Sequence, residues 1–211
     1  MKVVFSNYNF TPNWIKEYDF DYLVYDRSDS KEYLKDFPQE RIIYVENKGT
    51  DIYDKFGWII ENYENLPEVV LLSKSNMLKY IAKEEFDKVK DNKTFTPLLT
   101  NNHKTYSDSY GEVCFYKDGM YYERNNFWYL NQHKPKSTET AVELIKLLGL
   151  IAFPSYLKYL PFAPGSNYIV PRENILKHSK EFYEKLRSYL MWDRYPGEAM
   201  IIERGLYLLW R

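Results

Sequence analysis

VENKGTDIYDKFGWIIENYENLPEVVLLSKSN, residues 45–76, is the stretch that decides the fold. It predicts the end of a strand, a glycine turn, an amphipathic helix from Thr50, a proline break and a buried strand at Val69–Leu72. That last strand is wholly apolar, as expected for a central strand of a parallel sheet. Polar clusters follow both strands, at residues 47–51 and 73–76. Because open α/β sheets bind ligands beyond the carboxyl ends of their strands, the stretch predicts both a fold and the edge of a site.

Strand and helix patterns alternate through the first half of the chain. Strands are expected at residues 3–5, 22–25 and 41–45, and helices at 13–18, 30–37 and 77–90. The second half predicts a hairpin at 113–123, a strand at 168–170, and helices at 138–148, 179–190 and from 196 onward. This order predicts an α/β fold with a central mixed, mostly parallel β-sheet flanked by helices. No repeat or linker divides the chain, so residues 1–211 are expected to form a single domain.

Composition limits the classes of function. The chain has 211 residues, 45% of them hydrophobic, which is enough for a substantial core. Its net charge of −1 gives no general attraction to nucleic acid or to an anionic membrane. The single cysteine, Cys114, is expected in the core, and no apolar run approaches the ~18 residues of a membrane helix. A soluble cytoplasmic protein with no membrane span is therefore expected.

Aromatic residues make up 18% of the chain, with 22 tyrosines among them. Such side chains stack on sugars or bases as well as packing in cores. A/T-biased coding is the alternative explanation for their high number. A nucleic-acid-binding domain stays an alternative, but the neutral charge counts against it because phosphate contacts supply most of such affinity. The chain stops inside an apolar helical run at residues 208–211, so we expect the N-terminal part of a longer protein with further C-terminal domains.

Candidate site residues gather at the ends of the predicted strands. Asp26 and Arg27 follow the second strand, where they either bind a ribose or base edge or form a surface turn. Lys48, Gly49 and Asp51 stand at a helix N-terminus, where they either touch a diphosphate or make only a tight turn. No phosphate loop, GxGxxG, GxSxG or His-Glu-x-x-His signature is present.

The fourth predicted strand ends in Ser73, Lys74, Ser75 and Asn76. Their hydroxyl, ammonium and amide groups stand where a metal-diphosphate often binds in such sheets. Helix capping by the last two residues is the structural alternative. His103 follows a later strand in a polar loop and is the histidine best placed for a site.

Two glutamates near the C-terminus are candidates for catalysis. Glu198 stands at the start of the last predicted helix, and Glu203 precedes Arg204 within it. A carboxylate on an otherwise apolar helix is costly to bury without a partner. Glu203 is therefore expected to have either an ion pair or a chemical role.

With these residues in place, the chain resembles the GT-A class of nucleotide-sugar glycosyltransferases. Residues 47–51 and 71–75 resemble the Asn-x-Gly-x-Asp and strand-end Lys-Ser patterns of enzymes of rhamnan and capsular polysaccharide synthesis. Residues 165–170 and 203–206 are similar to the closing block of those families. The chain also resembles the N-terminal domain of chlorella-virus glycosyltransferases that decorate the capsid. The resemblance covers most of the chain and implies a GT-A-like (Rossmann-type) fold.

The resemblance implies transfer of a hexose or deoxyhexose from a UDP-sugar to a glycan acceptor, in viral capsid glycan synthesis in the host cytoplasm. In GT-A enzymes the nucleotide lies over the first two strands, which here supply Ser6, Asn7, Tyr8, Asp26 and Arg27. These enzymes hold the diphosphate through a divalent cation at an Asp-x-Asp motif after the fourth strand, so Mn2+ or Mg2+ is implied. This chain has no carboxylate there and leaves Ser75 and Asn76 as metal ligands, with weaker oxygens than carboxylates.

In inverting members of the class, a carboxylate near a late helix takes the proton of the acceptor hydroxyl. The resemblance implies Glu198 or Glu203 for this role, in a direct displacement at the anomeric carbon. The absent Asp-x-Asp motif also leaves a second possibility, a catalytically inactive nucleotide- or sugar-binding module. Such a module would bind UDP without turnover.

Overall fold

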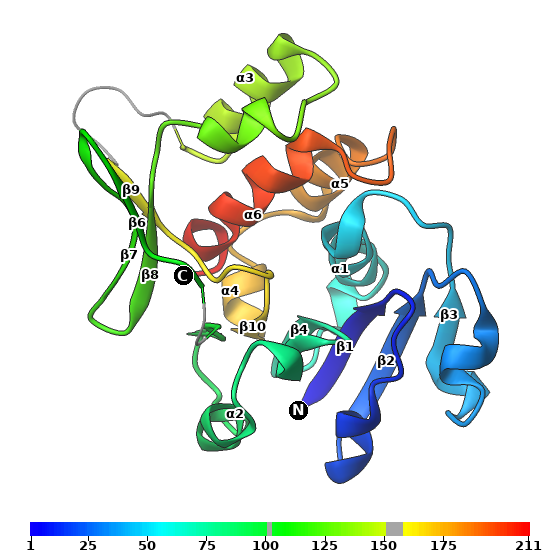
Figure 1. Cartoon of the computed structure of the whole chain (residues 1–211). Coiled ribbons are helices and arrows are strands. Elements are labelled where there is room, and N and C mark those ends of the chain that lie inside the picture. Colours follow the sequence, from blue (N-terminus) through cyan, green and yellow to red (C-terminus); the bar gives the residue numbers. More distant parts are fainter. Residues whose placement is uncertain (101–102, 151–157) are drawn as a thin grey trace.

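The computed structural model describes residues 1–100, 103–150 and 158–211 (Figure 1). Its centre is a six-stranded sheet of order β3-β2-β1-β4-β10-β5. The strands are β1 (Lys2–Asn7), β2 (Asp21–Asp26), β3 (Ile42–Tyr44), β4 (Val69–Lys74), β5 (Thr96–Pro97) and β10 (Tyr168–Pro171). Neighbouring strands from β3 to β4 are parallel, whereas β10 is antiparallel to β4 and to β5. This confirms the predicted mixed, mostly parallel sheet flanked by helices.

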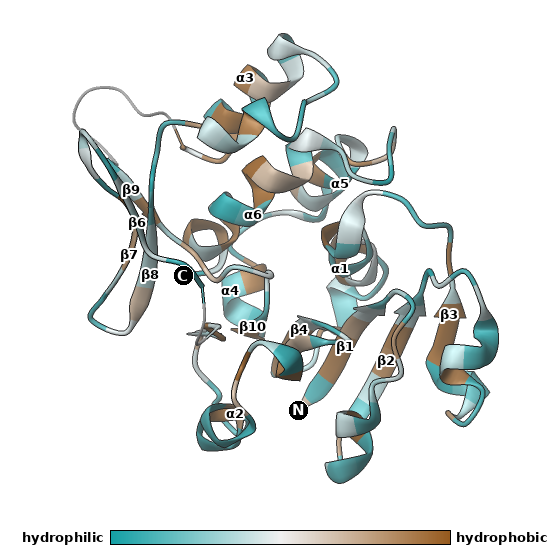
Figure 2. Cartoon of the chain, in the orientation of Figure 1, coloured by the Kyte–Doolittle hydropathy of each residue, from teal (hydrophilic) through white to brown (hydrophobic). Residues whose placement is uncertain are grey.

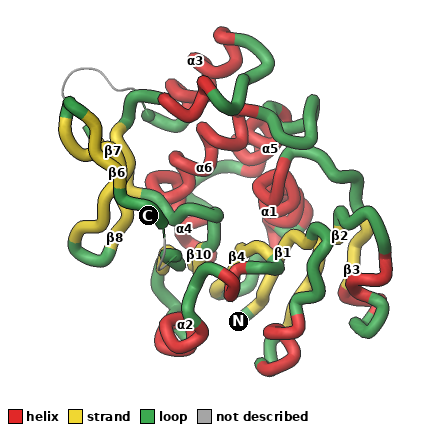
Figure 3. The backbone as a smooth tube through the Cα atoms, viewed as in Figure 1, coloured by secondary structure: helices red, strands yellow, loops and turns green. Residues whose placement is uncertain are grey.

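Helices and short turns cover both faces of the sheet (Figure 3). The helices are α1 (Thr50–Glu61), α2 (Lys83–Val89), α3 (Thr138–Leu147), α4 (Arg172–Ile175), α5 (Lys180–Ser188) and α6 (Gly197–Trp210). Successive β1 side chains point to opposite faces. Val4 joins a core that includes Phe56 of α1, while Phe5 joins a second core that includes Phe86 of α2. Figure 2 accordingly shows apolar residues concentrated in the strands of the central sheet.

A smaller antiparallel sheet packs beside α6 at one end of the molecule (Figure 1). It contains β6 (Tyr106–Asp108), β7 (Gly111–Lys117), β8 (Met120–Arg124) and β9 (Tyr159–Pro161). The predicted hairpin is confirmed, and its turn residues Asp118 and Gly119 have φ of 50° and 73°, as a two-residue type I′ turn requires. Cys114 is buried in the core of this sheet, as predicted.

The secondary structure departs from prediction mainly in short segments. The helices expected at residues 13–18 and 30–37 are single 3-10 turns, at Asn13–Glu17 and Lys31–Leu34. The helix expected at 77–90 is broken, because Ala82 adopts an extended conformation between a 3-10 turn and α2. The elements β6, β9 and α4 are too short to show a periodic pattern in the sequence. Within the described ranges, no helix combines the length and apolarity that crossing a membrane requires.

Candidate functional site

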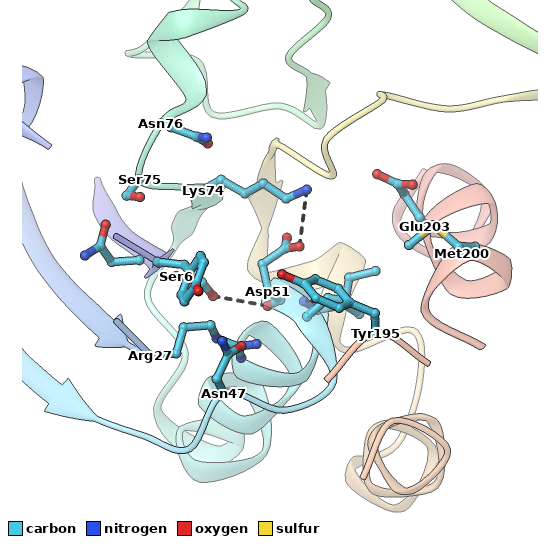
Figure 4. Close-up of a pocket in the computed structure, with 14 residues that line it drawn as sticks. Ser6, Arg27, Asn47, Asp51, Lys74, Ser75, Asn76, Tyr195, Met200 and Glu203 are labelled. Carbon is cyan, nitrogen blue, oxygen red and sulfur yellow. Dashed lines mark hydrogen bonds and ion pairs between the residues drawn. The ribbon is translucent and has the colours of Figure 1, made fainter. Parts of the chain in front are cut away.

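A pocket of about 340 Å3 opens at the carboxyl ends of β1 and β4, between the N-terminus of α1 and the side of α6 (Figure 4). This is the edge at which parallel strands of an open α/β sheet deliver polar residues to a ligand. Predicted site residues from β1, β2, α1, β4 and α6 meet there. The lining residues are Ser6, Asn7, Tyr8, Arg27, Asn47, Thr50, Asp51, Ile52, Lys74, Ser75, Asn76, Tyr195, Met200 and Glu203.

Asp51 and Lys74 line one wall of the pocket and, with the buried partners of Asp51, Lys55 and Ser166, form what we name the cationic cluster. Lys55 Nζ donates to Asp51 Oδ2 (2.5 Å), to Ser166 O (2.5 Å) and to Ser166 Oγ (2.7 Å). The Ser166 hydroxyl in turn donates to Asp51 Oδ2 at 2.5 Å. Lys74 Nζ stands 3.4 Å from the other Asp51 oxygen. One carboxylate thus faces two ammonium groups, so the cluster carries excess positive charge.

The surroundings favour the charged forms of Asp51 and Lys74, whereas burial lowers the pKa of Lys55 although Asp51 opposes that shift. Burial acts to raise the pKa of the Asp51 carboxyl, but Lys55 and Lys74 outweigh it and hold that pKa well below its ordinary value. Burial acts to lower the pKa of Lys74, but Asp51 and Glu203 raise it above its ordinary value. The Lys55 side chain is 1% exposed and that of Lys74 is 37% exposed. Lys74 is therefore the ammonium group of the cluster that reaches the pocket.

Arg27, at the end of β2, is held by Asp54 of α1. Its Nε and Nη2 lie 3.1 and 2.6 Å from the two Asp54 oxygens, and its Nη1 donates to Lys48 O at 2.9 Å. Burial raises the pKa of the Asp54 carboxyl to about 6, although the Arg27 guanidinium opposes the shift. Arg27 lines the pocket as predicted, but most of its donors already have partners. It shapes the pocket floor by joining β2, α1 and the loop between β3 and α1.

Asp26 lies beside the pocket and does not line it. Its Oδ1 accepts hydrogen bonds from Asn7 Nδ2 (3.0 Å), Ser28 Oγ (2.6 Å) and Ser28 N (3.2 Å). The residue is 3% exposed. The predicted contact of this carboxylate with a ribose or base is not supported, because it is bound to the turn after β2 and to Asn7 at the end of the neighbouring strand β1.

The turn before α1 is fixed by close packing. Gly49 has a φ of +66°, and a Cβ there would lie 2.8 Å from Leu190 O. The backbone N–H groups of Gly49 and Thr50 donate to the carbonyls of Asp193 and Arg194. Gly49 is therefore a packing requirement of this turn. The neighbouring Lys48 side chain, predicted to touch a diphosphate, pairs with Glu46 at 3.0 Å and does not line the pocket.

The opposite wall of the pocket is formed by α6, which contributes Glu203 to the lining. Together with Arg204 of α6 and Glu123 of β8, Glu203 forms what we name the anionic cluster. Arg204 Nε and Nη2 donate to the two Glu123 oxygens at 2.9 and 3.1 Å, and Nη1 donates to Glu203 Oε2 at 3.1 Å. The Gly165 N–H donates to Glu203 Oε1 at 2.9 Å. Two carboxylates thus share one guanidinium, and of the two, Glu203 lines the pocket.

Glu198 does not face the pocket. Its Oε1 accepts from Lys136 N (2.8 Å) and Thr140 Oγ1 (2.9 Å), and its Oε2 accepts from Trp192 Nε1 (3.1 Å). The residue is 1% exposed and joins α6 to the segment that begins α3. Its position does not support the predicted role as general base, because the buried side chain does not reach the pocket.

Two further predicted residues lie outside this pocket. Ser73 is fully buried within β4, and its hydroxyl finds no hydrogen-bond partner in the described part of the chain. His103 lines two adjacent cavities, one of which shares Lys74 and Asn76 with the pocket. Burial lowers the pKa of His103, so its imidazole is neutral at pH 7.

The rim of the pocket contains residues that the sequence patterns did not reveal. The Arg194 guanidinium lies 4.4 Å from the ring centre of Tyr8 and 5.0 Å from that of Tyr195. The Asn47 amide, with its oxygen turned toward Arg194, accepts from Nη2 (3.0 Å) and Nε (2.8 Å). A flat cationic and aromatic surface therefore borders the pocket between the β3–α1 loop and the loop before α6.

Both charged clusters lie within a region shared with other proteins. A family of proteins of unknown function, DUF3431, matches residues 3–210. The chain belongs to this family. No curated protein and no solved structure matches it significantly. Because the match spans nearly the whole chain, the entire pocket of this DUF3431 protein falls inside the family region.

The pocket of this DUF3431 protein fits a divalent cation poorly. The described residues include no group of three or more His, Cys, Asp or Glu side chains placed to bind a metal. The predicted ligands Ser75 and Asn76 line the pocket but offer only neutral oxygens. The Asp51 carboxylate already faces Lys55 and Lys74, whose charges would repel a divalent cation. The expectation of Mn2+ or Mg2+ stays a prediction that these residues do not favour.

Proposed function

We propose that this protein is a glycosyltransferase that moves a hexose or deoxyhexose from a UDP-sugar to a glycan acceptor. One observation carries the proposal. One pocket at the carboxyl ends of parallel strands has two lysines around Asp51 on one wall and the carboxyl group of Glu203 on the other. Anion binding and proton removal are the two tasks that such a transfer asks of an enzyme.

The donor is proposed to lie along the strand ends. Its diphosphate would meet Lys74 beside the N-terminus of α1, where the helix dipole favours negative charge. Its nucleoside would lie toward Ser6, Asn7 and Tyr8 at the end of β1, where the resemblance to GT-A enzymes also places it. The sugar would then extend toward α6 and Glu203.

The chemical step requires a base near the sugar. Asp51 and Glu203 are the acidic residues of the pocket lining. Asp51 is held by two ammonium groups, so Glu203 is the better base. In the proposed step the acceptor oxygen bonds to the anomeric carbon, and its proton passes to Glu203. The bond from that carbon to the β-phosphate oxygen breaks, and its electron pair leaves with UDP.

A catalytically inactive nucleotide- or sugar-binding module is the second candidate. It is favoured by the pairing of Glu203 with Arg204, because this ion pair already engages one oxygen of the proposed base. A role in viral capsid glycan synthesis in the host cytoplasm is part of the proposal and rests on the resemblance to those glycosyltransferases.

Calorimetric titration with UDP, GDP and CMP, each with and without Mn2+, tests the nucleotide site. Selective UDP binding would support the donor assignment, and release of UDP from a panel of UDP-sugars would then separate an enzyme from a binding module. Absence of binding by every nucleotide would overturn the assignment of this pocket to a nucleotide-sugar donor. Turnover without selectivity for UDP would support a glycosyltransferase but overturn the assignment of a UDP-sugar as its donor.

A further inference from the structure

We infer that the diphosphate site of this protein works without a divalent cation, with the Lys74 ammonium in the place of the metal. The inference rests on the proposed function, because it concerns the donor in the same pocket. It departs from the family resemblance, which implies Mn2+ or Mg2+ at the end of the fourth strand. Lys74 is the last residue of that strand, β4.

Lys74 carries the charge of the cationic cluster that is free to meet a ligand. Lys55 is fully engaged, because it donates to Asp51 and twice to Ser166 and is 1% exposed. That contact satisfies the single carboxylate of the cluster. Lys74 adds a second positive charge at a longer distance, 3.4 Å, and is 37% exposed. Of the two ammonium groups that face Asp51, Lys74 is therefore the more loosely held and the one that an anion in the pocket can reach.

The backbone around Lys74 places this charge firmly. The N–H of Lys74 donates to Asn167 Oδ1 at 2.9 Å, and the N–H of Ser75 donates to Ser6 O at 2.9 Å. The strand end is thus held from β1 on one side and from the start of β10 on the other. In Figure 4 the Lys74 side chain extends from β4 into the pocket, toward Glu203. A fixed ammonium at this point can bind phosphate oxygens as a point charge.

A metal ion would compete with Lys74 for the same wall of the pocket. A hard cation needs several oxygen ligands, usually with carboxylates among them. The carboxylate of this wall, Asp51, already has two ammonium partners, and Ser75 and Asn76 offer neutral oxygens. A divalent cation placed here would have to displace Lys74 from Asp51. The same positive charge that attracts the diphosphate therefore keeps the metal out.

The test is calorimetry on the full chain with UDP and UMP, in EDTA and in Mn2+. We expect UDP to bind in EDTA, with little gain from Mn2+. Lys74→Met is expected to weaken UDP binding by about 10- to 100-fold, the usual loss for a charge-assisted hydrogen bond, and to affect UMP much less. Lys74→Arg should retain most of the affinity. Lys79→Met, which removes an exposed lysine five residues away, is the matched control and should bind as the parent does.

The outcomes separate this inference from the proposed function. UDP binding that requires Mn2+ would overturn the metal-free site and leave the glycosyltransferase proposal standing. Equal UDP affinity in Lys74→Met and the parent would overturn the role of Lys74. Failure of every nucleotide to bind, with or without Mn2+, would overturn the proposed function and this inference with it. The urea midpoint of each variant shows whether a loss of binding reflects unfolding, and Lys74→Arg then decides the role of the charge.

Discussion

Two charged clusters face one pocket, and they carry opposite excess charge. In the cationic cluster two ammonium groups share the Asp51 carboxylate, whereas in the anionic cluster two carboxylates share the Arg204 guanidinium. Each cluster has one deeply buried pair, with Lys55 in the first and Glu123 in the second. Each also has one further ion at the pocket, Lys74 in the first and Glu203 in the second.

The difference between the clusters indicates which of their ions have a role beyond stabilising the fold. A buried ion pair offsets the cost of removing its charges from water, and that is a structural requirement. The third ion of each cluster is not needed for that balance. Excess charge of opposite sign on facing walls suits two substrates, an anionic donor and an acceptor that loses a proton. The predictions that follow test whether the third ion acts independently of the buried pair.

Glu203→Gln is expected to have the largest effect. An amide cannot take the proton of the acceptor, so release of UDP from its sugar should fall by about 10²- to 10⁴-fold. UDP affinity should change little, because Gln keeps an oxygen toward the Gly165 N–H. Steady-state assays of UDP release, with calorimetry on the same samples, measure both quantities.

Glu198→Gln is the matched control, because it makes the same change on the same helix away from the pocket. It removes an acceptor of the Trp192 N–H and should lower stability without lowering turnover by a comparable factor. Equal losses of turnover in the two variants would contradict the assignment of Glu203 as base. Full turnover in Glu203→Gln would favour the view that the third ion of the anionic cluster is structural.

Arg204→Met should have the next largest effect, on stability. It leaves Glu123 buried without a counter-ion, which typically costs about 3–5 kcal/mol in the free energy of unfolding. Urea denaturation measures the loss. The double variant Glu123→Gln/Arg204→Met should recover much of it, because no buried charge is then left alone. If the double variant is no more stable, the cost comes from lost packing of Arg204 against the rings of Tyr129 and Phe162.

Much of the fold was predictable because its signals are local. Three of these signals are visible within a few residues each. They are the alternation of Val3, Val4 and Phe5 between two cores, the helical spacing in α1 and the Asp118-Gly119 turn. The rule that ligands bind beyond the carboxyl ends of parallel strands also predicts, from sequence alone, that the ends of β1 and β4 and the start of α1 share one edge. The short 3-10 turns and the strands β6 and β9 could not be predicted, because so few residues show no periodic pattern.

The charge balance of the site was less predictable. Lys55 stands four residues after Asp51, a spacing that places both on one helix face, so it could have been recognised as a partner. Ser166 lies 115 residues from Asp51, and nothing local links them. Glu198 and Glu203 have similar surroundings in sequence, yet their separation of five residues directs them to different neighbours, the segment before α3 and the pocket. Only the tertiary packing distinguishes them.

The smallest expected effect is on the pH dependence of stability. It distinguishes the buried pair of Asp51 and Lys55 from Lys74, the third ion of the cationic cluster. The pKa of Asp51 is lower in the folded protein than its ordinary value of 3.8, so the folded state binds fewer protons at this group than the unfolded state does. Stability from this carboxylate is therefore fully present above pH values near 4 and is lost as pH falls toward the folded pKa. Urea midpoints should drop with acid between pH 4 and 3, below the range in which the raised pKa of Asp54 has the opposite effect, in the parent and in Lys74→Met. The drop should be shallower in Asp51→Asn, which has no carboxyl to titrate. If Lys74→Met flattens the curve as much as Asp51→Asn does, Lys74 is part of the buried pairing, and its charge is not free for a ligand.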